Sequence, residues 1–303
     1  MQKQVNVLMS TYNGEKYLRE QIDSVLAQDG VDVRLEIRDD GSKDSTISII
    51  EEYVAKDNRV KFHKGRNVGV IRSFFMLLEG AEPSEYYAFC DQDDYWEKDK
   101  LSSAVGLLED LHTSGPALYC SNLNVVDEEL NFCRLSKSKP IKTDNKYSAL
   151  VDFYAVGCTE VFNDSAAQLV KKHLTEDTLM HDSWMFLMCS FFGSVIYDFT
   201  PHIKYRQHGH NVIGSKKNKW EQIKDSFNRI CDRSIQPRLQ SANALFKMCE
   251  KELSGQDLEK VRKVTSYKKN LITRISLLFD FEIRSCSFLS DVKYRLLIIL
   301  GTI

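Results

Sequence analysis

Short apolar runs alternate with amphipathic helical patterns through the first third of this 303-residue chain. The runs that predict strands are residues 5–9, 34–38, 60–63 and 86–89. Helical spacing of apolar residues follows the first three runs, at residues 17–26, 44–54 and 70–79. This alternation predicts an α/β fold with a mostly parallel central sheet flanked by helices.

Each predicted strand ends in a cluster of polar residues. The clusters are residues 10–14, 39–42, 65–69 and 91–94. In open α/β sheets, ligands collect beyond the carboxyl ends of the strands. We therefore expect the four clusters to face one cleft.

The last cluster is the most informative of the four. Asp91, Asp93 and Asp94 directly follow a strand, and Tyr95 and Trp96 come behind them. Carboxylates placed in this way can converge on one hard divalent cation, which a diphosphate can then bridge. The alternative is a solvated acidic turn, which an isolated Asp-x-Asp would favour.

The pattern continues more irregularly to about residue 214. Helices are expected at 98–111, 165–173 and 182–192, and strands at 117–126, 159–162, 195–199 and 203–206. Residues 134–146 read as a long loop. From residue 215 the pattern is helical, so we expect a catalytic domain at 1–214 and a helical C-terminal region at 215–303.

Charge divides the chain in the same way. Residues 216–303 hold 18 Lys and Arg against 10 Asp and Glu, a net charge of +8, which leaves −10 for residues 1–215. A basic tail can contact an anionic membrane surface or can be a solvated helical face. Its closing apolar run, 296–300, is too short to span a bilayer and suits an interfacial helix, a helix packed on its own domain or a homodimer contact. Nucleic acid is not expected, because exposed aromatics are not interleaved with the basic residues.

Two features indicate the compartment. The first residues lack a basic segment followed by an apolar one, so they do not read as a secretion signal. The eight cysteines contain no Cys-x-x-Cys pair. Both favour a reducing cytoplasm, with peripheral attachment to the inner face of a bacterial plasma membrane as an option.

Together, the polar motifs resemble those of inverting family 2 glycosyltransferases with the GT-A fold, which is Rossmann-like. Ser-Thr-Tyr-Asn-Gly at 10–14, Asp-Asp-Gly-Ser at 39–42, Asn67-Val-Gly69 and Asp-Gln-Asp-Asp-Tyr-Trp at 91–96 occur in the family's order. The resemblance runs from about residue 5 to 214. The form of the last motif, with Arg-Gln-His-Gly-His-Asn at 206–211, is most similar to bacterial rhamnosyltransferases of surface-polysaccharide synthesis.

The resemblance implies a divalent metal, Mn²⁺ or Mg²⁺. Asp93 would be its main ligand, with Asp91 nearer the donor and Asp94 assisting. His208 would complete the coordination sphere, or would be a hydrogen-bonded loop histidine.

The resemblance also assigns the donor site. The nucleotide sugar would contact Thr11, Tyr12, Asn13, Asp39, Asn67, Asp91 and Gln92. Asp39 would accept the imide N–H of a pyrimidine, while Asp40 organises the turn. Asn67 has a helix-capping role as its simpler explanation.

Inversion requires one base opposite the leaving group, and Asp182 is the candidate. Similar enzymes carry an acidic pair here, whereas this chain has His181-Asp182, so His181 is the alternative base. The acceptor would be bordered by Gly157, Cys158, Thr159 and Trp184. Trp184 can equally be a core aromatic.

The expected function is transfer of one sugar, L-rhamnose from dTDP-rhamnose, to a lipid-linked glycan in capsule or cell-wall synthesis. A UDP-linked galactose, N-acetylglucosamine or galactofuranose donor is the first alternative. A non-catalytic sugar-nucleotide-binding protein is the second.

Overall fold

The computed structural model describes residues 2–141, 145–208, 237–253 and 255–301. The chain divides into two compact units. Unit 1 comprises residues 1–141, 155–176 and 180–208, and unit 2 comprises residues 142–154, 177–179 and 209–303. The expected boundary at 214/215 lies outside the described residues. The sequence pattern did not predict that residues 142–154 belong to the same unit as the C-terminal helices.

Unit 1 is built on a seven-stranded sheet with the strand order β10-β6-β9-β4-β1-β2-β3. Its strands are β1 (Lys3–Thr11), β2 (Val31–Asp39), β3 (Val60–Lys64), β4 (Tyr86–Cys90), β6 (Ala117–Ser121), β9 (Val161–Asn163) and β10 (Ser194–Asp198). Only β9 pairs antiparallel with its neighbours in this sheet; the other pairings are parallel. The predicted α/β class with a mostly parallel sheet is confirmed.

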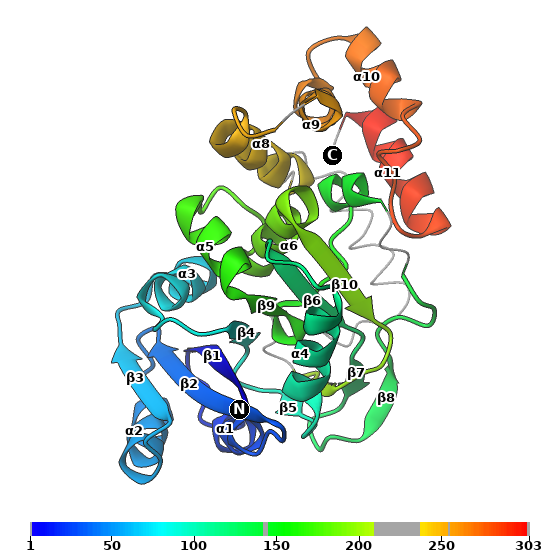
Figure 1. The fold of residues 1–303 in the computed structure, drawn as a ribbon. Helices are drawn as coiled ribbons and strands as arrows, with labels where there is room; N and C mark the ends of the chain where they lie inside the picture. Colours follow the sequence, from blue (N-terminus) through cyan, green and yellow to red (C-terminus); the bar gives the residue numbers. More distant parts are fainter. Residues whose placement is uncertain (1, 142–144, 209–236, 254, 302–303) are drawn as a thin grey trace. The chain divides into compact units, whose positions relative to one another are not determined.

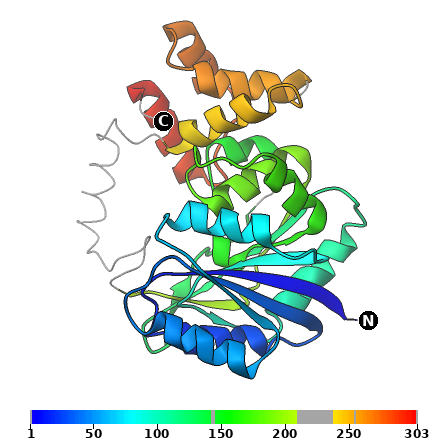
Figure 2. The ribbon, with the colours of Figure 1, turned by 90° about the vertical axis from the view of Figure 1, so that its left-hand side faces the viewer.

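Helices cover both faces of this sheet (Figures 1 and 2). One face packs against α1 (Leu18–Leu26), α2 (Thr46–Lys56) and α4 (Lys100–Asp110), and the other against α3 (Val70–Gly80), α5 (Asp164–Lys172) and α6 (His181–Phe192). Val5, Val7 and Met9 of β1 point into the first layer and are fully buried. Burial on both faces explains why β1 reads as a continuous apolar run.

A second, four-stranded sheet lies at the end of unit 1. Its strand order is β5-β11-β7-β8, with β5 (Tyr95–Trp96), β11 (Ile203–Arg206), β7 (Asn124–Val126) and β8 (Phe132–Leu135). This sheet joins β5, which directly follows the carboxylate motif, to β11, more than 100 residues later in the chain.

Three local expectations were wrong. Residues 117–126 form two strands, because Asn122 turns the chain by accepting the N–H groups of Leu123 at 3.0 Å and Lys137 at 2.9 Å through its side chain. The expected loop from 134 overlaps β8. The strand expected from Thr159 begins at Val161, after the 3₁₀ turn η2 (Gly157–Thr159).

Unit 2 is helical. It contains the 3₁₀ helix η1 (Lys146–Leu150), α8 (Pro237–Cys249), α9 (Gly255–Ser266), α10 (Leu271–Leu278) and α11 (Phe288–Leu300). Tyr147 Oη donates to Asp257 Oδ1 at 3.0 Å and joins η1 to α9. Lys260 Nζ donates to Asp280 Oδ1 at 2.9 Å, with both side chains buried. These polar contacts connect η1 to α9, and α9 to the segment that follows α10.

Gly193, between α6 and β10, allows the backbone to approach that of Pro116, which directly precedes β6. Its N–H donates to the Cys189 carbonyl at 3.0 Å, and a Cβ atom at this position would lie 2.1 Å from the Pro116 carbonyl oxygen. We expect Gly193→Ala to lower the free energy of unfolding by about 1–3 kcal/mol, because the rigid backbone at Pro116 must shift. Urea denaturation measures the change.

Gly106→Ala is the matched control. Gly106 lies in the interior of α4, is exposed and has no heavy atom within 4 Å of the added Cβ. This variant should gain about 0.5–1 kcal/mol from helix propensity. Equal stabilities for the two variants would contradict the close-approach argument.

Candidate active site

The polar loops after β1, β2 and β4 are hydrogen-bonded to one another. The Tyr12 N–H donates to Gln92 Oε1 at 2.8 Å, and Gln92 Nε2 donates back to the Tyr12 carbonyl at 3.1 Å. The Asn13 N–H donates to Ser42 Oγ at 2.8 Å, and Asn13 Oδ1 accepts from the Lys43 N–H at 2.9 Å. Three of the four predicted clusters therefore form one connected structure at the carboxyl edge of the sheet.

Asp39 organises the turn that follows β2. Its carboxylate accepts from Thr11 Oγ1 at 3.1 Å, from the N–H groups of Gly41 at 3.0 Å and Ser42 at 2.8 Å, and from Ser42 Oγ. Asp39 is fully buried. A pyrimidine imide would have to replace or share one of these donors. The base-binding role of Asp39 stays a prediction.

Asp40 holds the loop that follows β3, residues 65–69, in place. It accepts from the N–H groups of Val68 at 2.8 Å and Gly69 at 2.9 Å, and it forms a buried ion pair with Arg38 at 2.7 Å. The expectation that Asp40 organises its own turn was wrong, because Asp39 does so. Gly41, with φ of +85°, passes so close to Asn67 that a Cβ would lie 3.0 Å from the Asn67 nitrogen. Asn67 does not cap α3, whose N-cap is Gly69.

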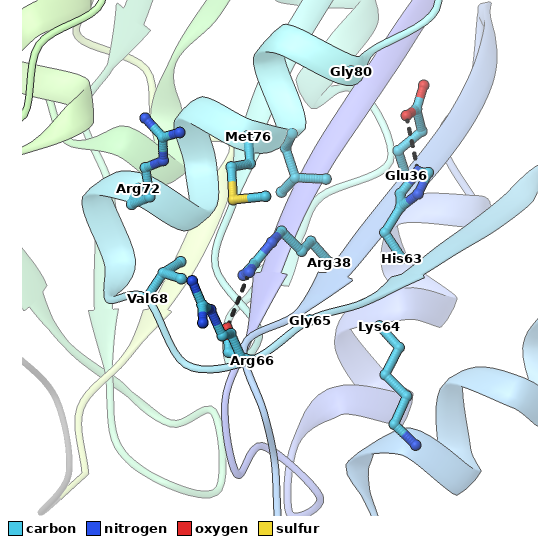
Figure 3. Close-up of a pocket in the computed structure, with 11 residues that line it drawn as sticks. Glu36, Arg38, His63, Lys64, Gly65, Arg66, Val68, Arg72, Met76 and Gly80 are labelled. Atoms are coloured by element: carbon cyan, nitrogen blue, oxygen red, sulfur yellow. Dashed lines mark hydrogen bonds and ion pairs between the residues drawn. The ribbon is translucent and has the colours of Figure 1, made fainter.

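A cavity of about 390 Å³ opens beside this loop, between α3 and strands β2 and β3 (Figure 3). Its charged lining is mostly basic and consists of Arg38, His63, Lys64, Arg66 and Arg72, with Glu36 as the acidic member. Arg38 Nη2 donates to the Arg66 carbonyl at 3.1 Å, which orients the guanidinium toward the loop. The positive charge favours anions next to the 65–69 loop. The sequence pattern did not single out Arg38.

Two of the aspartates after β4 are hydrogen-bonded to Arg206 at the end of β11. Asp94 is fully buried, and its Oδ1 accepts from the Arg206 N–H at 3.0 Å, while Arg206 Nε donates to the Asp93 carbonyl at 2.9 Å. The Arg206 guanidinium lies 4.5 Å from the centre of the Tyr17 ring and forms an ion pair with Glu20. Arg206 thereby positions the carboxylate loop against α1.

His208 lies beside Asp93, as the resemblance implies. Its Nε2 is 2.8 Å from Asp93 Oδ2, and its ring is 5.1 Å from that of Tyr17. Both a metal ligand and a hydrogen-bonded loop histidine are compatible with this contact. The next residues of the Arg206–Asn211 motif lie outside the described residues.

Negative charge accumulates at this end of β4. Burial, followed by the charges of Asp93 and Asp182, raises the pKa of Asp91 to about 7. Burial and the charges of Asp93 and Asp91 also raise the pKa of Asp94 well above its ordinary value. A nearby cation would relieve this cost.

The residues present fit a divalent cation. Asp91, Asp94 and Cys158 each offer one ligand atom, and these atoms lie within 4.8 Å of one another. Asp94 Oδ2 is buried and has no hydrogen-bond partner. Burial raises the pKa of the Cys158 thiol, so the available donors at neutral pH are mainly carboxylate oxygens, which suit Mg²⁺ or Mn²⁺. This set shares Asp91 with the predicted set of Asp93, Asp91 and His208, and the ligands stay a prediction.

Asp182 lies in the first turn of α6, close enough to raise the pKa of Asp91. Its Oδ2 accepts from the Gly157 N–H at 2.9 Å, and its Oδ1 accepts from the Ser183 N–H at 2.6 Å. The N-cap of α6 is Met180, so Asp182 does not serve as the cap. Backbone donors and the helix N-terminus together stabilise a carboxylate here.

Comparison with known proteins identifies the family. The model of glycosyl transferase family 2 matches residues 6–169, which is just over half of the chain. The chain belongs to this family.

Relatives and solved structures agree with this assignment. The dTDP-rhamnosyl transferase RfbG of Shigella flexneri is 26% identical over 260 residues, which cover 75% of this chain and 86% of the relative. A structure of Staphylococcus aureus TarS with UDP-GlcNAc has a TM-score of 0.58 at 16% identity, covering 98% of this chain and 91% of that one. The mannosyltransferase PcManGT of Pyrobaculum calidifontis, with GDP-Man and Mn²⁺, has a TM-score of 0.53 at 15% identity, covering 100% and 87%. This family 2 glycosyltransferase therefore has the predicted GT-A fold.

Two of the expected acceptor residues of the glycosyltransferase are deep in the core. Trp184 is fully buried, and its Nε1 donates to the His173 carbonyl at 3.0 Å, so the structure places it in the core rather than at a sugar-binding surface. Thr159 is also fully buried and donates to the Val156 carbonyl at 2.7 Å. Gly157 and Cys158 are buried as well, but they contact the site through Asp182 and Asp94 respectively.

Glu160 is a buried carboxyl group that the sequence analysis missed. It is fully buried, and neither of its oxygens has a hydrogen-bond partner. Burial, and then the charge of Asp182, raises the pKa of Glu160 well above its ordinary value. The signal in the sequence was an acid placed between Thr159 and the apolar strand β9.

His181 packs in the core next to Asp182. Its ring stacks on Phe74 at 3.8 Å and meets the edge of Phe89 at 4.8 Å, and neither ring nitrogen has a hydrogen-bond partner. Burial lowers the pKa of His181 to about 4. The imidazole is therefore neutral at physiological pH, and this environment does not favour it as the catalytic base.

We expect His181→Phe to retain turnover within about tenfold, because an aromatic ring preserves the stacking on Phe74. The variant should also respond differently to pH. Unfolded His181, with a pKa of about 6.5, takes up a proton as the pH falls while the folded form stays neutral, which costs the wild type about 2 kcal/mol of stability at pH 5 relative to pH 7. The variant lacks this loss. Urea denaturation at both pH values and a turnover assay measure the two effects.

A loss of turnover beyond about a hundredfold, in a variant that still folds, would instead identify His181 as the base.

Proposed function

We propose that this glycosyltransferase transfers one sugar with inversion from a nucleoside diphosphate donor to a hydroxyl group of a saccharide or lipid-linked glycan. The observation that supports this most is that two acidic groups lie near each other in different environments. A half-buried carboxylate, Asp182, receives two backbone N–H bonds within range of Asp91, which belongs to a separate acidic cluster. Such a pair suits one group for the acceptor and another for the leaving group.

The donor binds to the connected loops in this proposal. Thr11, Tyr12 and Asn13 contact the nucleoside, with Asp39 at the base and Asn67 at the neighbouring loop. Asp91 and Gln92 lie nearer the ribose and sugar. The side-chain oxygen and nitrogen of Gln92 are both hydrogen-bonded to the Tyr12 backbone, which connects this loop to the loop that contacts the nucleoside.

A divalent cation would be held by Asp93 and Asp91, with His208, Asp94 or Cys158 as further candidates. When bound, it offsets the negative charge that develops on the departing diphosphate. The protein holds its own carboxylates in position through Arg206, whose backbone N–H binds Asp94 and whose guanidinium binds the Asp93 carbonyl.

Asp182 acts as the base. The attacking acceptor oxygen forms the new bond to the anomeric carbon while the bond to the diphosphate breaks, and the hydroxyl proton moves to the Asp182 carboxylate. Gly157 leaves room for the acceptor, because its missing side chain would otherwise lie 3.1 Å from Asp182 Oδ2.

We further propose L-rhamnose from dTDP-rhamnose as the donor. The relative RfbG is named as a dTDP-rhamnosyl transferase and covers most of this chain. A UDP-sugar is the second candidate, because TarS is structurally similar and is solved with UDP-GlcNAc. The acceptor would be a lipid-linked glycan of capsule or cell-wall synthesis, met at the cytoplasmic face of a bacterial membrane. A non-catalytic role has less support, since the candidate base and the acidic cluster are both present.

Replacement of Asp182 by Asn should lower turnover by about 10²- to 10⁴-fold while the Kd of the donor changes little, because the amide cannot take the proton. Steady-state kinetics and donor titration separate the two quantities. Asp164→Asn is the matched control, because Asp164 occupies the first turn of α5. Near-normal turnover of Asp182→Asn would refute the assignment.

A thermal-shift panel tests the donor and the metal. We expect dTDP-rhamnose, with Mn²⁺ or Mg²⁺, to raise the Tm more than either component alone, because ligands that bind the folded state stabilise it. Asp93→Asn should abolish the additional shift. A larger shift with UDP-sugars would favour the second donor, and a full shift in the presence of a chelator would contradict the metal requirement.

A further inference from the structure

Unit 2 exposes an unusual amount of apolar surface on its last two helices. Among the described residues, most of the large exposed apolar side chains lie between 271 and 300. They are Leu271, Ile272, Ile275, Phe279, Phe281, Phe288, Leu289, Val292, Leu296, Ile299 and Leu300. Exposed apolar residues scattered singly are ordinary, whereas a concentration of this kind marks an interaction site.

On α11 these residues form one stripe. At 100° per residue, the six exposed apolar positions of α11 fall within an arc of about 120°. Tyr294, Leu297 and Ile298 fall on the opposite arc and are buried within the protein. The helix therefore has two apolar faces, of which its own fold covers one.

α10 repeats the arrangement. Leu271, Ile272, Ile275 and Phe279 lie within an arc of about 100°, and Leu277 on the far side is buried. The two helices are joined, because the Arg295 guanidinium of α11 donates to the Leu278 carbonyl. We call these two stripes, together with Phe281 in the segment between the helices, the α10–α11 face.

The charges around this face are predominantly positive. Three acidic residues occur between 267 and 301, and each is engaged by a base: Asp280 by Lys260 and Lys263, Glu282 by Lys260, and Asp291 by Arg295. Lys269, Arg284 and Lys293 are exposed in the same segment. Lys293 borders the exposed stripe of α11, about 20° beyond its edge.

We propose that the α10–α11 face binds the surface of an anionic lipid bilayer, with the apolar stripes in the interfacial region and Lys269, Arg284 and Lys293 at the headgroups. Phenylalanine and leucine on one side of a helix with adjacent basic residues are the composition of interfacial helices. Each basic residue near an anionic leaflet strengthens binding. Among the described residues, none of the helices combines the length and the apolar character of a transmembrane span.

Charge complementarity favours lipid over a second copy of the chain. A symmetric dimer through this face would bring the same basic residues of both copies together, which is unfavourable. The inference deepens the proposed function, because a lipid-linked acceptor is presented at a membrane surface. The test contains neither donor nor acceptor, so it can fail while the transfer reaction stands.

Vesicle co-sedimentation of the full chain is the experiment. Binding to phosphatidylcholine vesicles with 30–40% phosphatidylglycerol should exceed binding to pure phosphatidylcholine by about tenfold or more and should weaken with salt. The variant Ile272→Ser/Phe288→Ser/Leu289→Ser should lose at least about tenfold in affinity for the anionic vesicles. These three side chains are 79–81% exposed, so the fold should be retained, as circular dichroism can verify.

The matched control replaces the same number of exposed apolar residues elsewhere: Val54→Ser/Phe132→Ser/Met248→Ser should bind as the wild type does. Lys269→Gln/Arg284→Gln/Lys293→Gln should lose most of the preference for anionic lipid. Absence of binding by the wild type would overturn the proposal. So would a serine variant that binds vesicles normally but changes from dimer to monomer in light scattering, which would make the face an interface between copies.

Discussion

The acidic side chains gathered at the end of β4 are the constraint on which the candidate site depends. Asp94 is fully buried, and burial raises the pKa of Asp91 to about 7. Among the described residues, no lysine or arginine side chain forms an ion pair with either carboxyl group. Lys100 lies near Asp94, but burial lowers its pKa to about 8, and its ammonium group lies over the Trp96 ring at 3.6 Å. Charges held this way are costly unless a ligand balances them. The fold holds these carboxyl groups at the carboxyl edge of the sheet, beside the loops that follow β1, β2 and β3.

Arg206 explains how this arrangement is kept. The residue comes from β11, more than 100 positions after the aspartates, yet its backbone and guanidinium bind Asp94, the Asp93 carbonyl and Glu20. The small sheet that includes β5 and β11 brings it there. An arginine that satisfies backbone and helix groups can position the carboxylates without neutralising them, which leaves their charge available to a metal or a substrate.

The sequence predicted the first half of the fold well because local signals carried it. Val5, Val7 and Met9 read as a buried strand, and the polar cluster after each strand could be placed at one edge from the rules of parallel sheets alone. The insertion of antiparallel β9 between β4 and β6, and the break at Asn122, depend on contacts between distant segments.

The candidate site divides in the same way. Asp91, Asp93 and Asp182 were proposed from motifs, whereas the contacts by which Asp39 organises its turn and Asp40 holds the 65–69 loop depend on which donors reach each carboxylate in three dimensions. Glu160 had a visible signal, an acid before an apolar strand, but its meaning depends on burial that the sequence does not state.

Burial also distinguishes the acidic groups from one another. It raises the pKa values of Glu160 and Asp94 well above their ordinary range, so a charge on either group is costly unless a ligand balances it. Asp182 receives two backbone N–H bonds at the N-terminal end of α6, where a carboxylate is favoured. Neutral His181 beside it neither competes for a proton nor supplies one. In the proposed reaction, Asp182 would serve the acceptor and the acidic cluster after β4 would serve the leaving group, and these separate environments suit neighbouring acids to opposite ends of one transfer.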